Sequence, residues 1–298
     1  MARTSSKPRS EYAIQTVTNA LRMLEVFHSV PEMGVSDLAR RLKLHKNNAF
    51  RLLATLELAG YIQQSLETEN YRLGPRCLEL GHAFARSQKL MSLARPILEG
   101  LSAELRETTH LGILVDDQVV HLDGVLPNQL VLTGLRVGER LPSHCTALGK
   151  VLLGRDCGEP AAVSIVSEAS EASEALGGAS RGAAGVVPGS ARRVAAAADP
   201  SHDRQLVSYT KTTIVDPTKL IEELRNVAMQ GYAVDTEEYA AGLCCVAAPV
   251  CDAATRVDAA LSISGPSLRL PEDALHGRAA RAVVAAASQL SRELGARQ

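Results

Sequence analysis

The chain has 298 residues, of which 46% are hydrophobic and 22% are charged, and this composition allows two globular domains. The formal net charge of -1 excludes a globally basic, histone-like protein. An aromatic content of 3% and the lack of tryptophan argue against the base-stacking surface of a single-strand-binding protein. No run approaches ~18 apolar residues, so we expect no transmembrane helix. The polar residues 1–10 do not resemble a secretory signal.

Charge and cysteine usage add two expectations. Residues 1–75 hold ten basic and seven acidic side chains, so this end of the chain is the place to look for an anionic partner. The six cysteines, two of them adjacent, lack the pattern of a disulfide framework. We therefore expect reduced thiols and a cytoplasmic protein.

Three helices and a hairpin are expected over residues 12–74, after a disordered tail over 1–11. The first helix is predicted over 12–30, because Pro31 disfavours helical geometry at Val30. Its apolar stripe would comprise Val17, Ala20, Leu21, Leu24 and Phe27. The second is a short helix with Ser36 as its N-cap, burying Leu38, Ala39 and Leu42.

A longer third helix is predicted over 45–59, with Gly60 as a left-handed C-cap. Its apolar stripe would be Ala49, Leu52, Leu53 and Leu56. Short runs at 61–62 and 71–73 bracket the polar residues 63–70, as in a hairpin. Three helices followed by such a wing predict a winged helix-turn-helix.

The third helix carries side chains suited to a DNA major groove. Asn pairs with adenine and Arg with guanine in bidentate geometry, whereas Lys suits phosphates. The alternative for each side chain is a solvated helix face. Glu67 and Glu69 at the wing tip argue against phosphate contact there. The predicted DNA-binding residues are Arg40, Arg41, Lys43, His45, Lys46, Asn47, Asn48, Phe50 and Arg51.

Alternating helical and strand-like patterns continue after residue 90. Residues 156–205 interrupt them with 13 Ala, 7 Ser, 6 Gly and 3 Pro, a composition typical of a mobile lid or a poorly ordered insertion. Asp216 and Pro217 form a helix start and Gly231 a helix end. The expected helices lie at 93–106, 144–154, 216–231 and 273–294, and the expected strands at 111–115, 118–125, 134–137, within 231–252 and at 256–266.

Two sets of motifs resemble one known family. The runs VSDLARRLKLHKNNAFRLLATLELAGYIQQ and YRLGPRCLELG resemble the DNA-binding domain of the IclR (isocitrate lyase regulator) family of bacterial transcription factors. The blocks TALGK, GYAVDTEE, GLCCVAAPVCD and AALSISGP resemble its GAF-like effector domain. The resemblance implies an α/β (α+β) chain of two domains, with a linker helix at 75–90 and an effector-binding domain at 91–298. The family usually has Ser or Thr where this chain has Asn47 and Asn48.

The same resemblance implies a pocket for a small carboxylic acid. Backbone N–H groups at a helix start and two hydroxyls can bind a carboxylate. Ser262 and Ser264 lie two apart on one strand, so they share a face. Family members often have Gly where this chain has Ala147 or Leu148, and Leu148 would narrow the pocket or change its shape. The implied effector residues are Ala147 and Leu148 through their N–H groups, Asp235, Cys245, Ser262 and Ser264 through their side chains, and Leu243 as an apolar wall.

The sequence therefore predicts an effector-responsive regulator that binds double-stranded operator DNA. One recognition helix reads few bases, so a homodimer on a (pseudo)palindromic site is expected, with a homotetramer as the larger alternative. We expect no cofactor, no metal and no catalytic residues. The alternative is a metabolite-binding protein or enzyme with an unused helix-turn-helix. It would use the carboxylates of Asp235, Glu237 and Glu238, while Cys244, Cys245 and Cys251 lack a typical metal-ligand spacing.

Overall fold

The computed structural model describes residues 12–129, 133–154, 206–254 and 256–296. They form two compact units, and the chain passes from the first to the second between Gln88 and Lys89. Each unit has its own hydrophobic core. The tail at 1–11 and the Ala/Ser/Gly-rich residues 156–205, for which we expected disorder or a lid, lie outside the described residues.

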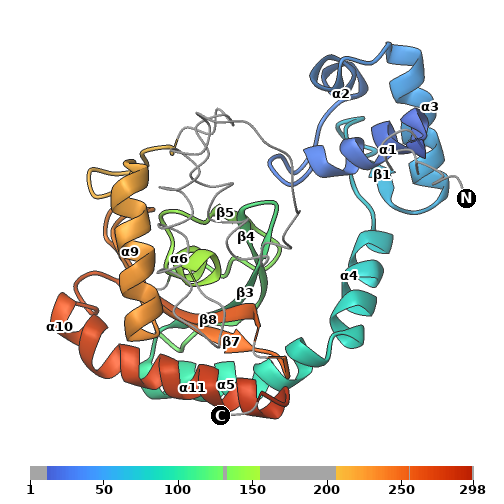
Figure 1. Cartoon of the computed structure of the whole chain (residues 1–298). Helices are drawn as coiled ribbons and strands as arrows, with labels where there is room; N and C mark the ends of the chain where they lie inside the picture. The colour runs from blue at the N-terminus through green and yellow to red at the C-terminus, as the bar shows by residue number, and fades with distance from the viewer. Residues whose placement is uncertain (1–11, 130–132, 155–205, 255, 297–298) are drawn as a thin grey trace, which may run out of the picture. The chain divides into compact units, whose positions relative to one another are not determined.

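The first unit is a winged helix-turn-helix followed by one further helix (Figure 1). Its core is formed by apolar side chains such as Met23, Leu38, Leu53 and Ile62, all almost completely buried. Tyr71 pairs with Met33 and ties the wing to the helices. The elements are α1 (Gln15–Val26), α2 (Val35–Leu42), α3 (Lys46–Leu58), β1 (Ile62–Gln64), β2 (Tyr71–Leu73) and α4 (Pro75–Ser87).

Two local predictions in this unit are wrong. Ser36 is not an N-cap: the N–H of Leu38 donates to the carbonyl of Gly34, so α2 starts at Val35 and Gly34 is its cap. The predicted stripe of α1 is misplaced at its N-terminal end. Val17 and Leu21 are 53% and 55% exposed, because the core contacts reach only the second half of the helix.

The second unit is built on a six-stranded antiparallel sheet with the order β5-β4-β3-β8-β7-β6. β3 and β4 are joined at Asp116 and Asp117, which both adopt positive φ, as in the tight turns that suit sheet twist. The last strand in the chain, β8, lies at the centre of the sheet. The strands are β3 (Thr108–Val115), β4 (Gln118–Val125), β5 (Arg140–Pro142), β6 (Ala233–Thr236), β7 (Leu243–Cys251) and β8 (Val257–Pro266).

Helices cover both faces of this sheet, so alternate strand residues enter two separate cores. Figure 1 shows α5 (Lys89–Leu105) and α11 (Ala280–Glu293) lying side by side on one face. The opposite face packs against α6 (Ala147–Gly154), which α9 (Pro217–Gln230) covers in turn. Together with the first unit, this architecture confirms the predicted α/β (α+β) fold with an N-terminal winged helix-turn-helix.

Two expectations in the second unit are corrected. Residues 134–137 form no strand, and the edge strand is β5 a few residues later. The C-terminal helix is not continuous: α10 (Glu272–Ala274) is followed by the π-helical segment η2 (Leu275–Ala279) before α11 starts. Gly277 inside η2 has non-helical dihedral angles, so the sequence periodicity of 273–294 conceals a break.

Candidate functional site

The predicted DNA-binding residues lie together at the turn between α2 and α3. Lys43 forms that turn with a positive φ of 56, and His45 caps α3, its Nδ1 accepting from the N–H of Asn47. Ala49 and Leu53 fix the other side of α3 in the core. All nine predicted side chains are exposed, so the recognition face is solvent-accessible within this unit.

The arginines of α2 already have protein partners. Arg40 forms a salt bridge with Asp37, and Arg41 donates to the hydroxyl of Ser29. Such exposed contacts are weak and easily exchanged for phosphate. Arg51, by contrast, is exposed on α3, as are Asn47, Asn48 and Phe50. The predicted residues thus lie on both α2 and α3 and on the turn between them.

The wing is held close to the helices by small residues and polar contacts. A Cβ added at Gly74 would lie 2.3 Å from the carbonyl oxygen of Gly60, so the end of β2 and the end of α3 approach at a distance that only glycine permits. Arg72 and Thr68 both bond to Glu32. The wing's position is thus determined by the helices that it flanks.

In the second unit, all seven predicted effector residues line one small cavity between α6 and the sheet. α6 begins at Ala147, so its first N–H groups have no acceptor within the helix. Thr146 caps this end, its hydroxyl accepting from the N–H of Gly149 and donating to the carbonyl of Pro142. Cys245 and Ser264 are cross-strand neighbours, and the Cys245 thiol donates to the Ser264 hydroxyl at 3.3 Å.

Five further residues line the cavity that the motifs did not single out: His121, Arg136, Leu141, Thr146 and Tyr239. Arg136 is the important addition, because it brings a full positive charge. It forms a salt bridge with Glu139 at 3.2 Å and lies over the ring of Tyr239, 5.3 Å from the centroid. Thr146 could have been found, since it is the first residue of the block TALGK.

Burial changes the protonation of the cavity walls. Burial raises the pKa of Asp235 to about 7, although its Oδ1 accepts from the N–H of Glu238. Burial lowers the pKa of His110 to about 3 and that of His121 to about 4, so both rings are neutral at neutral pH. These rings stack edge-on at 5.1 Å. His110 Nε2, His121 Nδ1 and Asp235 Oδ2 are buried without hydrogen-bond partners among the described residues.

Thiol chemistry is disfavoured in this cavity. Burial raises the pKa of Cys245 well above its ordinary value, and it raises the pKa of Cys145 to about 12. Both sulfurs are therefore protonated, weakly nucleophilic thiols. His144 of the same segment bonds through Nε2 to the carbonyl of Val207 at 3.0 Å, so its ring is hydrogen-bonded within the protein.

The free volume of the cavity is about 30 Å³, whereas one water needs ~10–15 Å³. In this form the cavity has room for a water or two, so an organic acid requires the walls to move apart. Among the described residues no group of three or more His, Cys, Asp or Glu side chains is arranged for a metal ion. None of the helices in the described part of the chain combines the length and apolarity needed to span a bilayer.

Comparison with known proteins identifies both units. Residues 16–66 match the IclR helix-turn-helix domain, and residues 82–170 and 181–292 match the C-terminal domain of bacterial transcriptional regulator IclR. The HTH-type transcriptional regulator XynR of Escherichia coli K12 is 32% identical over 283 residues, which are 95% of this chain and 98% of that protein.

Two solved structures share the fold. The IclR transcriptional regulator of Alicyclobacillus acidocaldarius superposes with a TM-score of 0.73 at 24% identity, covering 95% of this chain and 100% of that one. An IclR homologue from Microbacterium hydrocarbonoxydans, complexed with 4-hydroxybenzoate, gives 0.69 at 23% identity, covering 94% and 98%. The chain therefore belongs to the IclR family of DNA-binding transcriptional regulators.

Proposed function

We propose that this regulator binds its operator through α3 and that a small organic acid in the cavity under α6 changes its operator affinity. The main support for this proposal is the exposed polar face of α3. The opposite face of α3 packs in the core, whereas Asn47, Asn48 and Arg51 are exposed and can enter a major groove. Lys43, Lys46, Arg40 and Arg41 flank this face as phosphate-binding side chains.

The first experiment measures binding to the intergenic DNA beside the protein's own gene, with random DNA as competitor and at several salt concentrations. Arg51→Ala should weaken specific binding by about 1–3 kcal/mol, since Arg reads base edges. Lys46→Ala should weaken specific and random DNA alike and flatten the salt dependence. Equal loss of specific and random binding in Arg51→Ala would contradict a base-reading role.

The cavity's chemistry favours an acidic effector. Arg136 supplies the charge, the first N–H groups of α6 supply donors, and Ser262 and Ser264 supply hydroxyls. Neutral His121, with a free ring nitrogen, suits a polar substituent at the other end of the ligand. A structural relative that binds 4-hydroxybenzoate supports an aromatic carboxylate as the first compound to try.

Calorimetric titration with 4-hydroxybenzoate and related acids tests this assignment. Arg136→Met should weaken binding about tenfold or more, because it keeps the length of the side chain and removes the charge. Arg140→Met is the matched control: Arg140 lies on β5, bonds to Asp116 and does not line the cavity. Equal affinity in Arg136→Met and the wild type would remove Arg136 from the site.

The same proposal includes a homodimer, with a homotetramer as the alternative, in the compartment that holds the operator, the bacterial cytoplasm. It assigns no enzymatic activity. Asp235, the candidate for a catalytic carboxylate, is 1% exposed and lines the cavity together with neutral His121 and the Cys245 thiol, whose pKa burial raises. Neither of these side chains is an activated nucleophile. Turnover of any bound acid that Asp235→Ala abolishes would favour the enzyme instead.

A further inference from the structure

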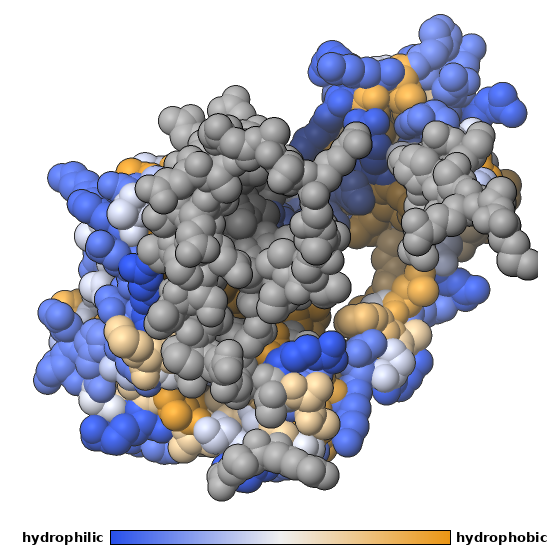
Figure 2. Space-filling view, viewed as in Figure 1, coloured by the Kyte–Doolittle hydropathy of each residue, from blue (hydrophilic) through white to orange (hydrophobic). Residues whose placement is uncertain are grey.

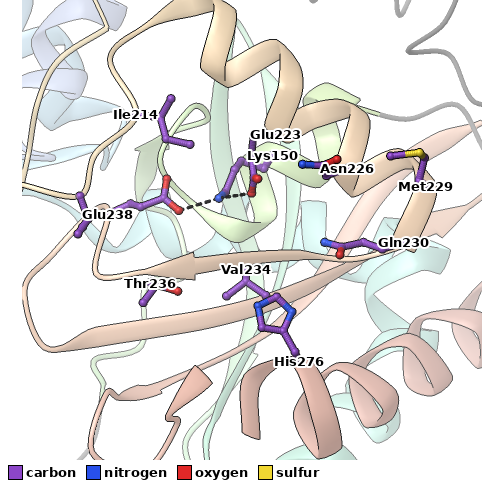
Figure 3. A pocket seen from close by; sticks show the side chains of 11 residues that line it. Lys150, Ile214, Glu223, Asn226, Met229, Gln230, Val234, Thr236, Glu238 and His276 are labelled. Carbon is purple, nitrogen blue, oxygen red and sulfur yellow. Dashed lines mark hydrogen bonds and ion pairs between the residues drawn. The ribbon is translucent and has the colours of Figure 1, made fainter. Parts of the chain in front are cut away.

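The second unit contains another opening, which we call the sheet-edge pocket (Figure 3). It is separate from the cavity under α6, which we call the effector cavity. It has a volume of about 570 Å³ and lies between α9 and the outer edge of β6. None of its lining residues lines the effector cavity. The pocket is large enough for a small molecule in the form seen here, whereas the effector cavity is not.

One buried cation and two carboxylates form one wall of this pocket. Lys150 is 1% exposed, and its Nζ donates to Oε1 of Glu223 at 2.8 Å and to Oε1 of Glu238 at 2.7 Å. Burial alone would lower the pKa of Lys150, but the two carboxylates outweigh it and raise that pKa. Lys150 is thus charged and pairs with both carboxylates, and no other lysine or arginine is found among the described lining residues.

With both carboxylates ionised, the wall has one positive and two negative groups and thus a surplus of negative charge, and burial raises the pKa of Glu238. Glu238 is 7% exposed, yet its Oε2 has no hydrogen-bond partner among the described residues. Leaving such an oxygen buried and unpaired costs free energy that a donor would recover. Glu223 is partly exposed, so its second oxygen is open to a ligand. An anion would be repelled here, whereas an ammonium group would balance the charge.

The remaining walls suit the body of a short amine. Asn226 and Gln230 of α9 offer amide groups, and Val234 and Met229 offer apolar contacts (Figure 3). His276 borders the pocket from the π-helical segment η2, with its Nδ1 bonded to the Tyr232 hydroxyl at 3.0 Å.

We propose that the sheet-edge pocket binds a small aliphatic amine whose ammonium group donates to the free oxygens of Glu223 and Glu238. Two short connections lead from this site to the effector cavity. The N–H of Glu238 donates to Oδ1 of Asp235 at 2.7 Å, and Lys150 lies one turn after Ala147 on α6. An amine in the pocket therefore alters the effector response, and by linkage the effector alters amine affinity equally; this coupling rests on the proposed function.

The full-length protein labelled with ¹³C-methyl methionine tests the site without DNA or effector. The probe is putrescine, with 1,4-butanediol and succinate as neutral and anionic analogues of similar length. Putrescine should shift the Met229 methyl resonance saturably, because Met229 lines the pocket, and Met229→Leu identifies that resonance. Absence of a shift at about 10 mM putrescine, a concentration that detects even weak binding, would overturn the proposal, as would equal binding of the diol.

Paired variants on α9 sharpen the test. Glu223→Gln should weaken putrescine binding about tenfold, whereas Glu222→Gln on the exposed side of the same helix should not change it. Equal affinity in both variants would overturn the assignment of the carboxylates. Saturating putrescine should also change operator affinity in the wild type and not in Glu223→Gln. Unchanged operator affinity would overturn the coupling, whereas loss of operator binding in all proteins would instead contradict the proposed function.

Discussion

At the scale of single residues, Asp235 makes folding stability depend on pH. Its folded pKa of about 7 lies above the ordinary value of 3.8, so between these values the folded state binds more protons than the unfolded state. Stability contributed by this group is therefore lost as pH rises from about 4 to about 7, and it stays low above that.

Asp235→Asn keeps the acceptor for the N–H of Glu238 and removes the titration. Relative to the variant, the wild type should lose roughly 2 kcal/mol of unfolding free energy between about pH 5 and pH 8. Urea unfolding of both proteins at the two pH values measures the difference. Parallel pH curves for the two proteins would show that Asp235 titrates normally.

The residues of the effector cavity show what motifs can reveal and what they cannot. Asp235, Ser262 and Ser264 belong to recognisable blocks, and the structure brings them to one cavity. Arg136 lies in the run 134–137, which was predicted as a strand, and Tyr239 follows the block GYAVDTEE, but neither position carried a sign of ligand binding. Arg136 reaches the cavity because residues 134–139 form an irregular segment before β5. Its guanidinium group is positioned by contacts with Glu139 and Tyr239.

At the scale of elements, helix ends with explicit capping chemistry were predicted best. α9 starts after Asp216, whose side chain accepts from the N–H of Thr218, and it ends at Gly231 with a positive φ. α2 was predicted less well, because its cap is a glycine without a side-chain signal. The false strand at 134–137 reflects a short apolar run, which by itself does not distinguish a strand from a loop.

α6 offers a test of how tightly an element is seated. A Cβ added at Gly149 would lie 2.2 Å from the carbonyl oxygen of Ser143, so Gly149→Ala must displace backbone and should cost about 1–3 kcal/mol. Gly100→Ala on the exposed face of α5 meets nothing within 4 Å and should stabilise by about 0.5–1 kcal/mol. Thermal unfolding of the two variants measures both changes. Similar changes in the melting temperature of both variants would mean that α6 can move at low cost, as entry of the proposed effector requires.

At the scale of the whole molecule, the first unit exposes several large apolar side chains on α1 and α4. Leu78, Leu80 and Phe84 on α4 are 62%, 54% and 50% exposed, and apolar atoms run along α4 in Figure 2. Val17 and Leu21 on α1 are exposed as well. Exposed apolar clusters of this kind mark association surfaces, which supports the proposed dimer.

Phe84→Glu should therefore weaken dimerisation about tenfold or more, since burying a charge at the centre of an interface is costly. Sedimentation velocity over a range of protein concentrations measures the change. His82→Glu on the same helix adds the same charge at another exposed position and serves as the control. Unaltered sedimentation of Phe84→Glu would show that α4 does not contribute to the interface.

The central position of β8 determines when the second unit can be completed during synthesis. β8 pairs with β3 on one side and β7 on the other, and it joins Thr108 to Ser264 across most of the unit. Until β8 leaves the ribosome, the β3–β4 and β6–β7 hairpins each present an unpaired edge. At roughly 5–20 residues per second the first unit emerges on the order of ten seconds or more before β8 does. The nascent second unit is therefore the part of the chain that most needs a chaperone.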